Sequence, residues 1–235
     1  MDAVIIDTIP LTIDEPGFLE LMRIRPESRQ AGEFRKLLSE ARHIARPKAA
    51  FRPAYLETSD EDSVTIEGTR FSSRVLTINL REPHLVFPFI ATCGAELQKW
   101  ATTIHTTLHC FWADSIQLMA LGCAVAALDA HLREITGSEK LSAMHPGSLE
   151  DWPLSEQIPL FNVLGEAPGR IGVTLTHSML LMPLKSTTGI QFVSEDGFTN
   201  CMLCPREDCP GRRVPFERHL LEKKYNVVPG RSRRT

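Results

Sequence analysis

Three cysteines near the end of the chain are the residues whose types and spacing most clearly indicate chemistry. Cys201, Cys204 and Cys209 lie within nine residues, in a polar stretch broken by Pro205 and Pro210. The two-residue gap between the first two lets both thiolates point to one centre, as zinc and iron–sulfur loops require. Arginines close by in the sequence favour the thiolate over the thiol. The spacing therefore predicts a metal site.

Which metal the site would hold stays open at the level of sequence. Structural zinc takes four ligands and only three are local, so His219 or the distant Cys93 would have to supply the fourth. A [4Fe–4S] cluster held by three cysteines, with one iron open or ligated from elsewhere, is equally feasible, although the spacing is not that of ferredoxins. In both cases the metal could serve only to staple the end of the chain. We therefore predict zinc or [4Fe–4S] at Cys201, Cys204 and Cys209.

The other three cysteines carry weaker signals. Cys93 lies in Ala91-Thr-Cys-Gly94, at a predicted junction between a strand and a helix, where a helix N-terminus would stabilise a thiolate. We expect it to be more exposed than Cys110 or Cys123, although a packed core position is the preferred interpretation. Cys110 and Cys123 fall inside predicted helices and are expected to be small core residues.

Motifs of several common enzyme classes are missing from the sequence. It contains no Gly-x-Ser-x-Gly, no Walker loop, no Gly-x-Gly-x-x-Gly after a strand and no His-Glu-x-x-His. Asp114, Asp129 and Glu134 lie on a predicted helix, but no pattern marks them as an acid/base pair. The sequence therefore predicts no catalytic residues.

Helical and strand signals alternate along the chain. A helix is expected from Ser28 to Ala45, before Pro47, and helical segments follow Gly94, the longest at 114–135 before a stop at Gly137. Runs rich in β-branched and aromatic residues predict strands at 4–6, 64–66, 71, 75–80, 85–90, 171–175, 179–182 and 190–193, with a turn at 185–189. This mixture predicts an α+β fold, with helices packed on antiparallel sheet.

Composition and charge limit the possible classes of protein. With 43% hydrophobic and 23% charged residues among 235, the chain is typical of a globular domain. We see no apolar run of about eighteen residues and no secretory signal, so we expect a cytoplasmic protein without a membrane span. Residues 201–235 hold nine Lys/Arg and four Asp/Glu, a net charge of +5. Because the whole chain has a net charge of −3, residues 1–200 carry −8. No aromatic residues interleave with the arginines of 231–234, so nucleic-acid binding is not expected.

Two segments resemble the activation domain of cobalamin-dependent methionine synthase. The first is Leu141-Ser-Ala-Met-His-Pro-Gly-Ser148, continued by 152–157 and 160–165, which is similar to that family's Pro-Gly-Tyr loop and the short helix after it. The second is Ile171-Gly-Val-Thr-Leu-Thr-His-Ser178, continued through Met182-Pro to Lys185-Ser-Thr-Thr-Gly-Ile190, which is similar to its Leu-Thr-Glu-Ser strand and Pro-x-x-Ser-x-Ser-Gly turn. The resemblance implies an activation domain at 1–198 and an added cysteine-rich, basic tail at 199–235.

The resemblance also implies a fold, a ligand and a partner. It implies a twisted antiparallel sheet packed with helices, a site for S-adenosylmethionine, and contact with cobalamin carried by a corrinoid protein or cobalamin-dependent methyltransferase. The protein would then assist reductive reactivation of that methyltransferase; the alternative is a non-enzymatic metal-binding interaction module that kept the fold but lost the ligand. Carried over by position, the implied site residues are His145, Pro146, Gly147, Ser148, Trp152, His177, Lys185, Ser186 and Gly189.

Three positions depart from the family's pattern. Ser148 stands where the family has a tyrosine, no arginine precedes Pro146 within the loop, and His177 replaces a glutamate. A hydrogen bond to a charged group contributes about 1.5–3 kcal/mol. We therefore expect these changes to weaken S-adenosylmethionine binding more than contact with a corrinoid protein.

Overall fold

The computed structural model describes residues 2–194, 197–206, 208–209 and 212–225. The helices and strands in these ranges follow in chain order: β1 (Val4–Ile6), α1 (Glu15–Leu21), α2 (Arg29–Ile44), β2 (Lys48–Phe51), β3 (Ala54–Ser59), β4 (Ser63–Ile66), β5 (Thr69–Ser72), α3 (Arg74–Asn79), β6 (Leu85–Thr92), α4 (Ala95–Ala101), α5 (Thr107–Thr136), β7 (Leu141–Met144), η1 (Leu154–Glu156), α6 (Gln157–Leu164), α7 (Ala167–Arg170), β8 (Thr174–Leu175), β9 (Leu181–Met182), β10 (Ser186–Val193), η2 (Asn200–Met202) and α8 (Arg218–Lys223).

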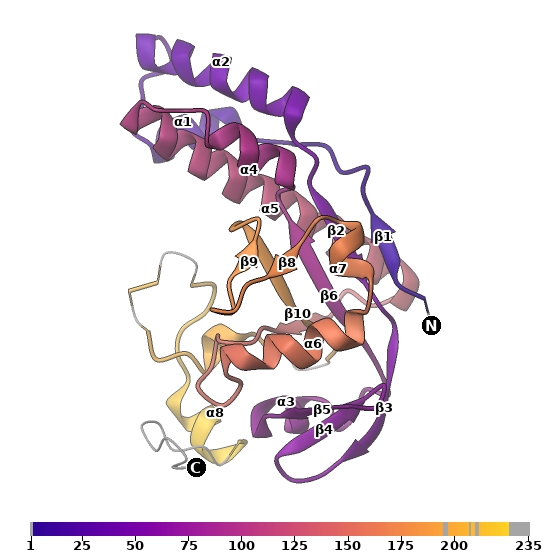
Figure 1. The fold of residues 1–235 in the computed structure, drawn as a ribbon. Helices are drawn as coiled ribbons and strands as arrows, with labels where there is room; N and C mark the ends of the chain where they lie inside the picture. The colour runs from indigo at the N-terminus through magenta and orange to yellow at the C-terminus, as the bar shows by residue number, and fades with distance from the viewer. Residues whose placement is uncertain (1, 195–196, 207, 210–211, 226–235) are drawn as a thin grey trace.

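Eight of the described strands form one curled sheet whose ladders are antiparallel (Figure 1). The central strand β6 pairs with β10 along one edge and with β2 and then β3 along the other. The sheet continues to β1 beyond β2, to β4 and β5 beyond β3, and to β7 beyond β10. The predicted α+β class, with a twisted antiparallel sheet packed with helices, is confirmed.

The two faces of the sheet pack against different helices, because successive side chains of a strand point to opposite faces. On one face, Phe87 and Phe89 of β6 form a buried cluster with Leu128 of α5. On the other face, Ile90 lies in the cluster that contains Leu160 of α6. Helices α2 and α4 pack against α5 at one end of the molecule (Figure 1). The first part of α5, with Trp112 and Ile116, lies in the cluster with α2 and α4, and its later part, with Leu128, packs on the sheet.

Helix α2 follows its sequence signals. The side chain of Ser28 accepts a hydrogen bond from the backbone N–H of Ala31 at 3.2 Å, which caps the helix start. Its apolar stripe, including Phe34 and Leu38, is buried in a cluster with Trp112 of α5. This confirms the predicted helix from Ser28 to the region before Pro47.

Three predicted elements differ in the structure. Of residues 75–80, predicted as a strand, 75–79 belong to α3 and Leu80 caps its end, because Ser73 Oγ accepts from Leu76 N at 3.0 Å and caps the start of a helix there. The break in the second helical region lies at 102–106, so α5 already begins at Thr107. Residues 186–189, predicted as part of a turn, form the start of β10.

Helix α5 is long and apolar enough, by length and composition, to cross a membrane. An 18-residue window of it has a mean hydropathy of 1.5, and 39% of that window is buried inside the molecule. This corrects the expectation that no segment has that length and hydropathy. In the structure α5 packs against β2, β6, α2 and α4, and the central helix of a globular protein meets the same criteria.

The described part of the cysteine-rich segment shares the core of the preceding chain. Leu203 and Tyr225 are buried in the same cluster as Phe198 and Trp152. The Tyr225 hydroxyl donates to Asn79 Oδ1 at 2.7 Å. The division into 1–198 and 199–235 stays a prediction, but the later segment is packed onto the earlier one.

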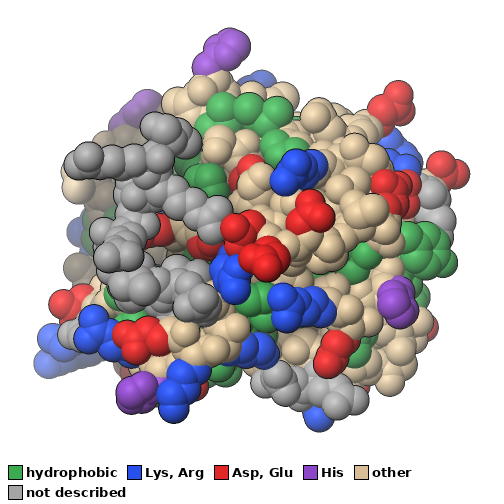
Figure 2. All heavy atoms as spheres, turned by 90° about the horizontal axis from the view of Figure 1, so that it is seen from below, with side chains coloured by type: hydrophobic (Ala, Val, Ile, Leu, Met, Phe, Trp, Pro, Cys, Tyr) green, Lys and Arg blue, Asp and Glu red, His purple; other side chains and the backbone are tan. Residues whose placement is uncertain are grey.

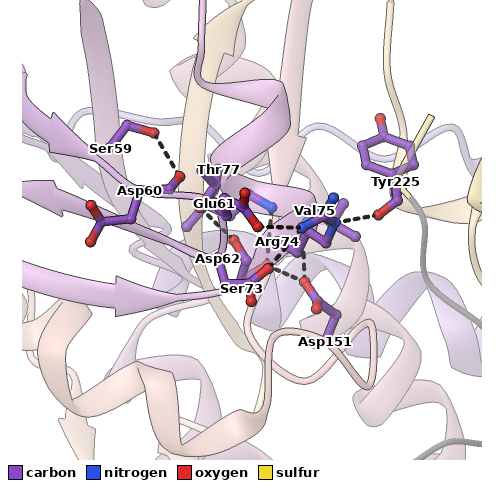
Figure 3. Close-up of polar contacts among 11 residues, drawn as sticks. Ser59, Asp60, Glu61, Asp62, Ser73, Arg74, Val75, Thr77, Asp151 and Tyr225 are labelled. Carbon is purple, nitrogen blue, oxygen red and sulfur yellow. Dashed lines mark hydrogen bonds and ion pairs between the residues drawn. The ribbon is translucent and has the colours of Figure 1, made fainter.

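An ion-pair network around Arg74 fixes this packing (Figure 3). Arg74 Nη1 lies 3.1 Å from Asp62 Oδ1, and Arg74 Nε donates to the carbonyl of Tyr225 at 2.7 Å. Asp151 Oδ2 accepts from Ser73 Oγ at 2.6 Å. One end of α3 therefore holds the β3–β4 turn, the loop after residue 148 and the C-terminal segment.

Candidate functional site

Pairing between β7 and β10 brings the two segments of the sequence prediction to one place. Ile190 of β10 is opposite Met144 of β7 in an antiparallel ladder. The loop 145–148, which follows β7, therefore meets residues 185–189, which begin β10. We call these two segments the loop–strand pair. It contains seven of the nine predicted ligand residues: His145, Pro146, Gly147, Ser148, Lys185, Ser186 and Gly189.

The loop is a hydrogen-bonded β-turn. Ser148 N donates to the carbonyl of His145 at 3.2 Å, with Pro146 and Gly147 at the two central positions. Gly147 has φ of 80°, as the third residue of a type II turn requires. Its N–H donates to the carbonyl of Trp152 at 2.7 Å. The sequence Pro-Gly directly after a strand is typical of a type II turn.

Gly189 allows β7, β10 and His145 to lie close together. A Cβ at this position would collide with the carbonyl oxygen of Met144 and would lie 2.8 Å from the Phe89 ring and 3.0 Å from His145 Nδ1. No larger residue fits without a shift of the backbone or of the Phe89 ring. The glycine is thus required for the close approach of strand and imidazole.

The side chains at the start of β10 are already engaged within the protein. Ser186 Oγ donates to the carbonyl of Pro183 at 2.7 Å and lies 2.8 Å from Thr92 Oγ1. Lys185 Nζ forms an ion pair with Asp114 Oδ1 of α5 at 2.9 Å. These contacts position the strand end rather than leave a cation or hydroxyl for a ligand.

A groove of about 350 Å³ borders the turn that leads into β10. Its wall comprises α4, the segment before β8 and the Met182-Pro183 step. The lining residues are Ala95, Gln98, Lys99, Thr102, Gly172, Thr174, Met182 and Pro183. Neither His145 nor Gly189 is among the residues that line this groove.

His145 is held in one tautomer by its backbone partner. Its Nδ1 lies 2.9 Å from the carbonyl oxygen of Thr188, and since a carbonyl can only accept, Nδ1 carries the proton. The lone pair of Nε2 is then an acceptor. Burial lowers the pKa of His145 below its ordinary value, the positive charge of Arg213 lowers it further, and the Thr188 bond opposes both. The imidazole is therefore a neutral acceptor near pH 7.

The structure adds Gln191 and Asp129, which sequence reasoning did not select. Gln191 lies on the face of β10 that carries Gly189, and its Nε2 donates to Asp129 Oδ1 of α5 at 2.6 Å. Gln191 is 4% exposed, and its Oε1 is buried without a hydrogen-bond partner. In the sequence, the only indication is that Gln191 is a polar residue within the apolar run Ile190-Gln-Phe-Val193. Its pairing with Asp129 is determined by the fold.

Two predicted ligand residues lie elsewhere. Trp152 is fully buried, packs edge-on against Phe71, and donates from its indole N–H to Glu156 Oε2 at 3.4 Å. The structure places it in the core beneath the loop. His177 is exposed in the turn between β8 and β9. Neither side chain belongs to the loop–strand pair.

The three clustered cysteines do not converge at ligand distance. In the described ranges, no three His, Cys, Asp or Glu side chains are arranged to hold a metal ion, and the thiols of Cys201, Cys204 and Cys209 are free. A backbone hydrogen bond from Arg213 is the largest of several effects that lower the pKa of Cys201. The metal site therefore remains a prediction.

The structure confirms the preferred interpretation of Cys93 as a packed core residue and contradicts the core positions predicted for Cys110 and Cys123. Cys93 is fully buried, and burial raises the pKa of its thiol to about 12, so the expectation that it would be more exposed than the other two was wrong. Cys110 is exposed, and Cys123 is half-buried, with its thiol donating to the carbonyl of Thr12 at 3.2 Å. Helix periodicity did not reveal which face of α5 the sheet would cover.

The molecule seen from below shows acidic and basic side chains side by side (Figure 2). The described side chains of this face form no continuous basic surface of the kind that binds phosphate backbones. The arginine-rich run 231–234 lies outside the described residues.

Comparisons with known proteins reveal a likeness of fold. No protein-family model matches the sequence, and no curated protein matches it. Among solved structures, the chain is similar to the MetH reactivation domain bound to AdoHcy, with a TM-score of 0.59 and 13% sequence identity over 82% of this chain and 78% of that one. At this identity the likeness shows that the chain shares the fold of the methionine synthase reactivation domain.

Proposed function

We propose that this protein docks on a corrinoid-binding methyltransferase and assists its reductive reactivation. The observation that carries the proposal is the loop–strand pair. Two segments that resemble the activation domain in sequence are neighbours in the ladder of β7 and β10, within the fold of a reactivation domain. A shared fold by itself would not indicate function, but the site segments and the fold point to the same role.

The proposed reaction needs one electron and one methyl group. An external one-electron donor reduces the inactive cobalt(II) centre of the partner, and the methyl group of S-adenosylmethionine is transferred to the reduced cobalt. The carbon–sulfur bond of the donor breaks and its electron pair stays on sulfur, which leaves AdoHcy. This chain would contribute binding and orientation, since it carries no recognised catalytic motif.

The polar groups at the loop–strand pair support a ligand that is rich in donors and positive charge. The neutral His145 offers Nε2 as an acceptor, and the buried Oε1 of Gln191 lacks a partner. The carboxylate of Asp129 lies beside Gln191. The amino and sulfonium groups of S-adenosylmethionine are suited to such acceptors.

Docking is tested by mixing the purified protein with a corrinoid protein loaded with cob(II)alamin. Formation of a complex and a change in the cobalt absorption spectrum are expected, followed by methylation when S-adenosylmethionine and a reductant are added. A matched variant, Gly122→Ala on α5, should behave as the native protein, because a Cβ there meets no atom within 4 Å. Absence of both complex and spectral change would contradict the proposal.

The second candidate is an interaction module that kept the fold without ligand binding. It is favoured by the engagement of Ser186 and Lys185 with protein partners, and by Ser148 in place of an aromatic contact. Calorimetry with AdoHcy separates the two. An AdoHcy affinity, obtained from the titration, that Gln191→Leu reduces at least about tenfold, equivalent to about 1.4 kcal/mol, supports the first candidate. Complex formation with the corrinoid protein without any heat of AdoHcy binding supports the second.

A further inference from the structure

The cysteine loop, which we define as the described residues 199–206, 208–209 and 212–214, is the sequence feature that the proposed function leaves unexplained. One side chain gathers its backbone. The guanidinium of Arg212 donates to the carbonyl oxygens of Cys201 at 3.1 Å and Cys204 at 2.9 Å, and also to those of Arg206 and Val214. The backbone N–H of Arg212 donates to the carbonyl of Cys209 at 3.0 Å. A single arginine thus contacts the backbone of all three cysteines.

Buried polar atoms without partners concentrate in the same loop. Within the part of the chain that the structure describes, both amide atoms of Asn200 and the Nε of Arg212 are buried without a hydrogen-bond partner. Buried polar groups are normally satisfied, so each exception calls for an explanation. Asn200 adjoins Cys201, and N–H donors of this kind stabilise thiolate sulfur in metal centres. The unpaired N–H groups are the second observation, besides spacing, that points to a missing group.

The loop is fixed to the core on both sides. Leu203 is 2% exposed and Tyr225 is fully buried. Glu217 N donates to the carbonyl of Met202 at 2.7 Å and joins the two sides of the loop. The cysteines therefore lie on a segment whose ends are anchored, so metal binding needs only local closure.

The loop lies along the outer edge of β7, next to the loop–strand pair. Thr199 forms a parallel bridge with Ala143 of β7, so the chain runs toward Cys201 in the direction in which β7 runs toward His145. The charge of Arg213 acts on His145. The two segments are therefore neighbours in the structure.

We propose that Cys201, Cys204 and Cys209 bind one thiolate-liganded metal centre, beside the loop–strand pair, with Arg212 as its positioning residue. The sulfur atoms, which do not converge in the structure, would be drawn together by the metal, because binding energy closes the loop. The centre is either a zinc ion or an iron–sulfur cluster. Metal binding at these cysteines does not depend on the proposed function.

Metal binding is tested on the full chain, purified anaerobically and analysed for zinc, iron and acid-labile sulfide. About one zinc ion per chain, or iron with sulfide in a brown protein, is expected. Cys201→Ser, Cys204→Ser and Cys209→Ser should each lower the metal content strongly, whereas Cys110→Ser and Cys123→Ser on α5 should retain it. A metal-free protein that takes up neither zinc nor iron and sulfide on reconstitution, or serine variants with native metal content, would overturn the proposal.

The role of Arg212 is tested with cobalt(II) as a spectroscopic substitute for zinc. Arg212→Lys and Arg212→Met should weaken cobalt binding by about 10–100-fold, as expected for groups that orient metal ligands. At saturating cobalt, the thiolate-to-metal absorption should match that of the native protein, while each Cys→Ser variant should lose about one third of it, since each cysteine supplies one of three thiolates. If Arg212→Met bound cobalt with the affinity of the native protein, Arg212 would not be a positioning residue of the metal site.

The location is tested by nuclear magnetic resonance of the histidine rings. Metal binding should shift the His145 resonances and leave those of His43, on α2, unchanged. Unchanged His145 resonances in metal-loaded protein would contradict the placement. If metal binds and the corrinoid protein does not, the proposed function fails and the site stands; if docking occurs without any metal site, the opposite holds.

Discussion

The loop–strand pair and the cysteine loop lie side by side, yet different forces hold them. In the first, β10 is bonded to β6 and β7 on its two edges, and Gly189 lets the backbone and His145 pack without a gap. In the second, one side chain, Arg212, donates four hydrogen bonds to backbone carbonyl oxygens of the loop. The hydrogen-bonded strands fix the geometry of the loop–strand pair without a bound ligand. In the cysteine loop, by contrast, the arginine holds the backbone while the cysteine sulfur atoms remain apart.

The largest contrast should appear in thiol reactivity. Cys93, whose backbone N–H donates to the carbonyl of Lys185 at 2.9 Å, is fully buried with a raised pKa, whereas Cys201 is half-buried with a lowered pKa. In metal-free protein at pH 7.5, iodoacetamide should modify Cys201 on the order of 10³-fold faster, because Cys93 reacts only through unfolding, which costs about 5–15 kcal/mol. Peptide mass spectrometry over time measures both rates. Equal rates would break the comparison.

Substitution at Gly189 should have the next largest effect. In Gly189→Ala, the added methyl group collides with Met144 O and the Phe89 ring, which should reduce the free energy of unfolding by about 2–3 kcal/mol. Gly122→Ala, in the middle of α5 with no atom within 4 Å of the new Cβ, should instead stabilise by up to about 1 kcal/mol. Urea denaturation of the two variants gives the values. A similar loss in both would mean that the strand contact is not tight.

Removal of the Arg212 side chain should act locally. Arg212→Met in metal-free protein should raise amide hydrogen exchange in residues 200–206 by about tenfold, equivalent to about 1.4 kcal/mol of local opening. Amides of β10 should exchange at native rates, since the sheet ladder does not involve Arg212. Exchange measured by mass spectrometry separates the two regions. Faster exchange in both would show that they open as one unit.

The smallest effect concerns pH. Because the pKa of His145 is lower in the folded than in the unfolded chain, the unfolded chain binds the proton first as pH falls. Stability should therefore be fully present above the ordinary histidine pKa of about 6.5 and should decline below it. His145→Asn, whose side-chain NH₂ can replace Nδ1–H toward Thr188 O, should lose part of this slope. Thermal melting between pH 7.5 and 5.5 measures it, and an unchanged slope would exclude His145 as the cause.

The sequence predicted the secondary structure where local signals were strong. The cap at Ser28 and the apolar stripe of α2 determine that helix, and Pro-Gly after β7 is sufficient for the turn at 145–148. It failed at residues 75–80, where β-branched side chains suggested a strand. There Ser73 and Asp151, which is distant in sequence, cap the start of a helix.

By itself, the sequence determined the α+β class, the spacing of the three cysteines and the glycine at 189. Only the tertiary structure decided that 145–148 and 185–189 meet, that Gln191 pairs with Asp129, that Trp152 and Cys93 are buried, and that Arg212 gathers the cysteine loop. Local signals report the conformation of neighbouring residues along the chain. Strand pairing, burial and long-range hydrogen bonds depend on which face each element presents to the others, and one sequence without its fold does not specify that.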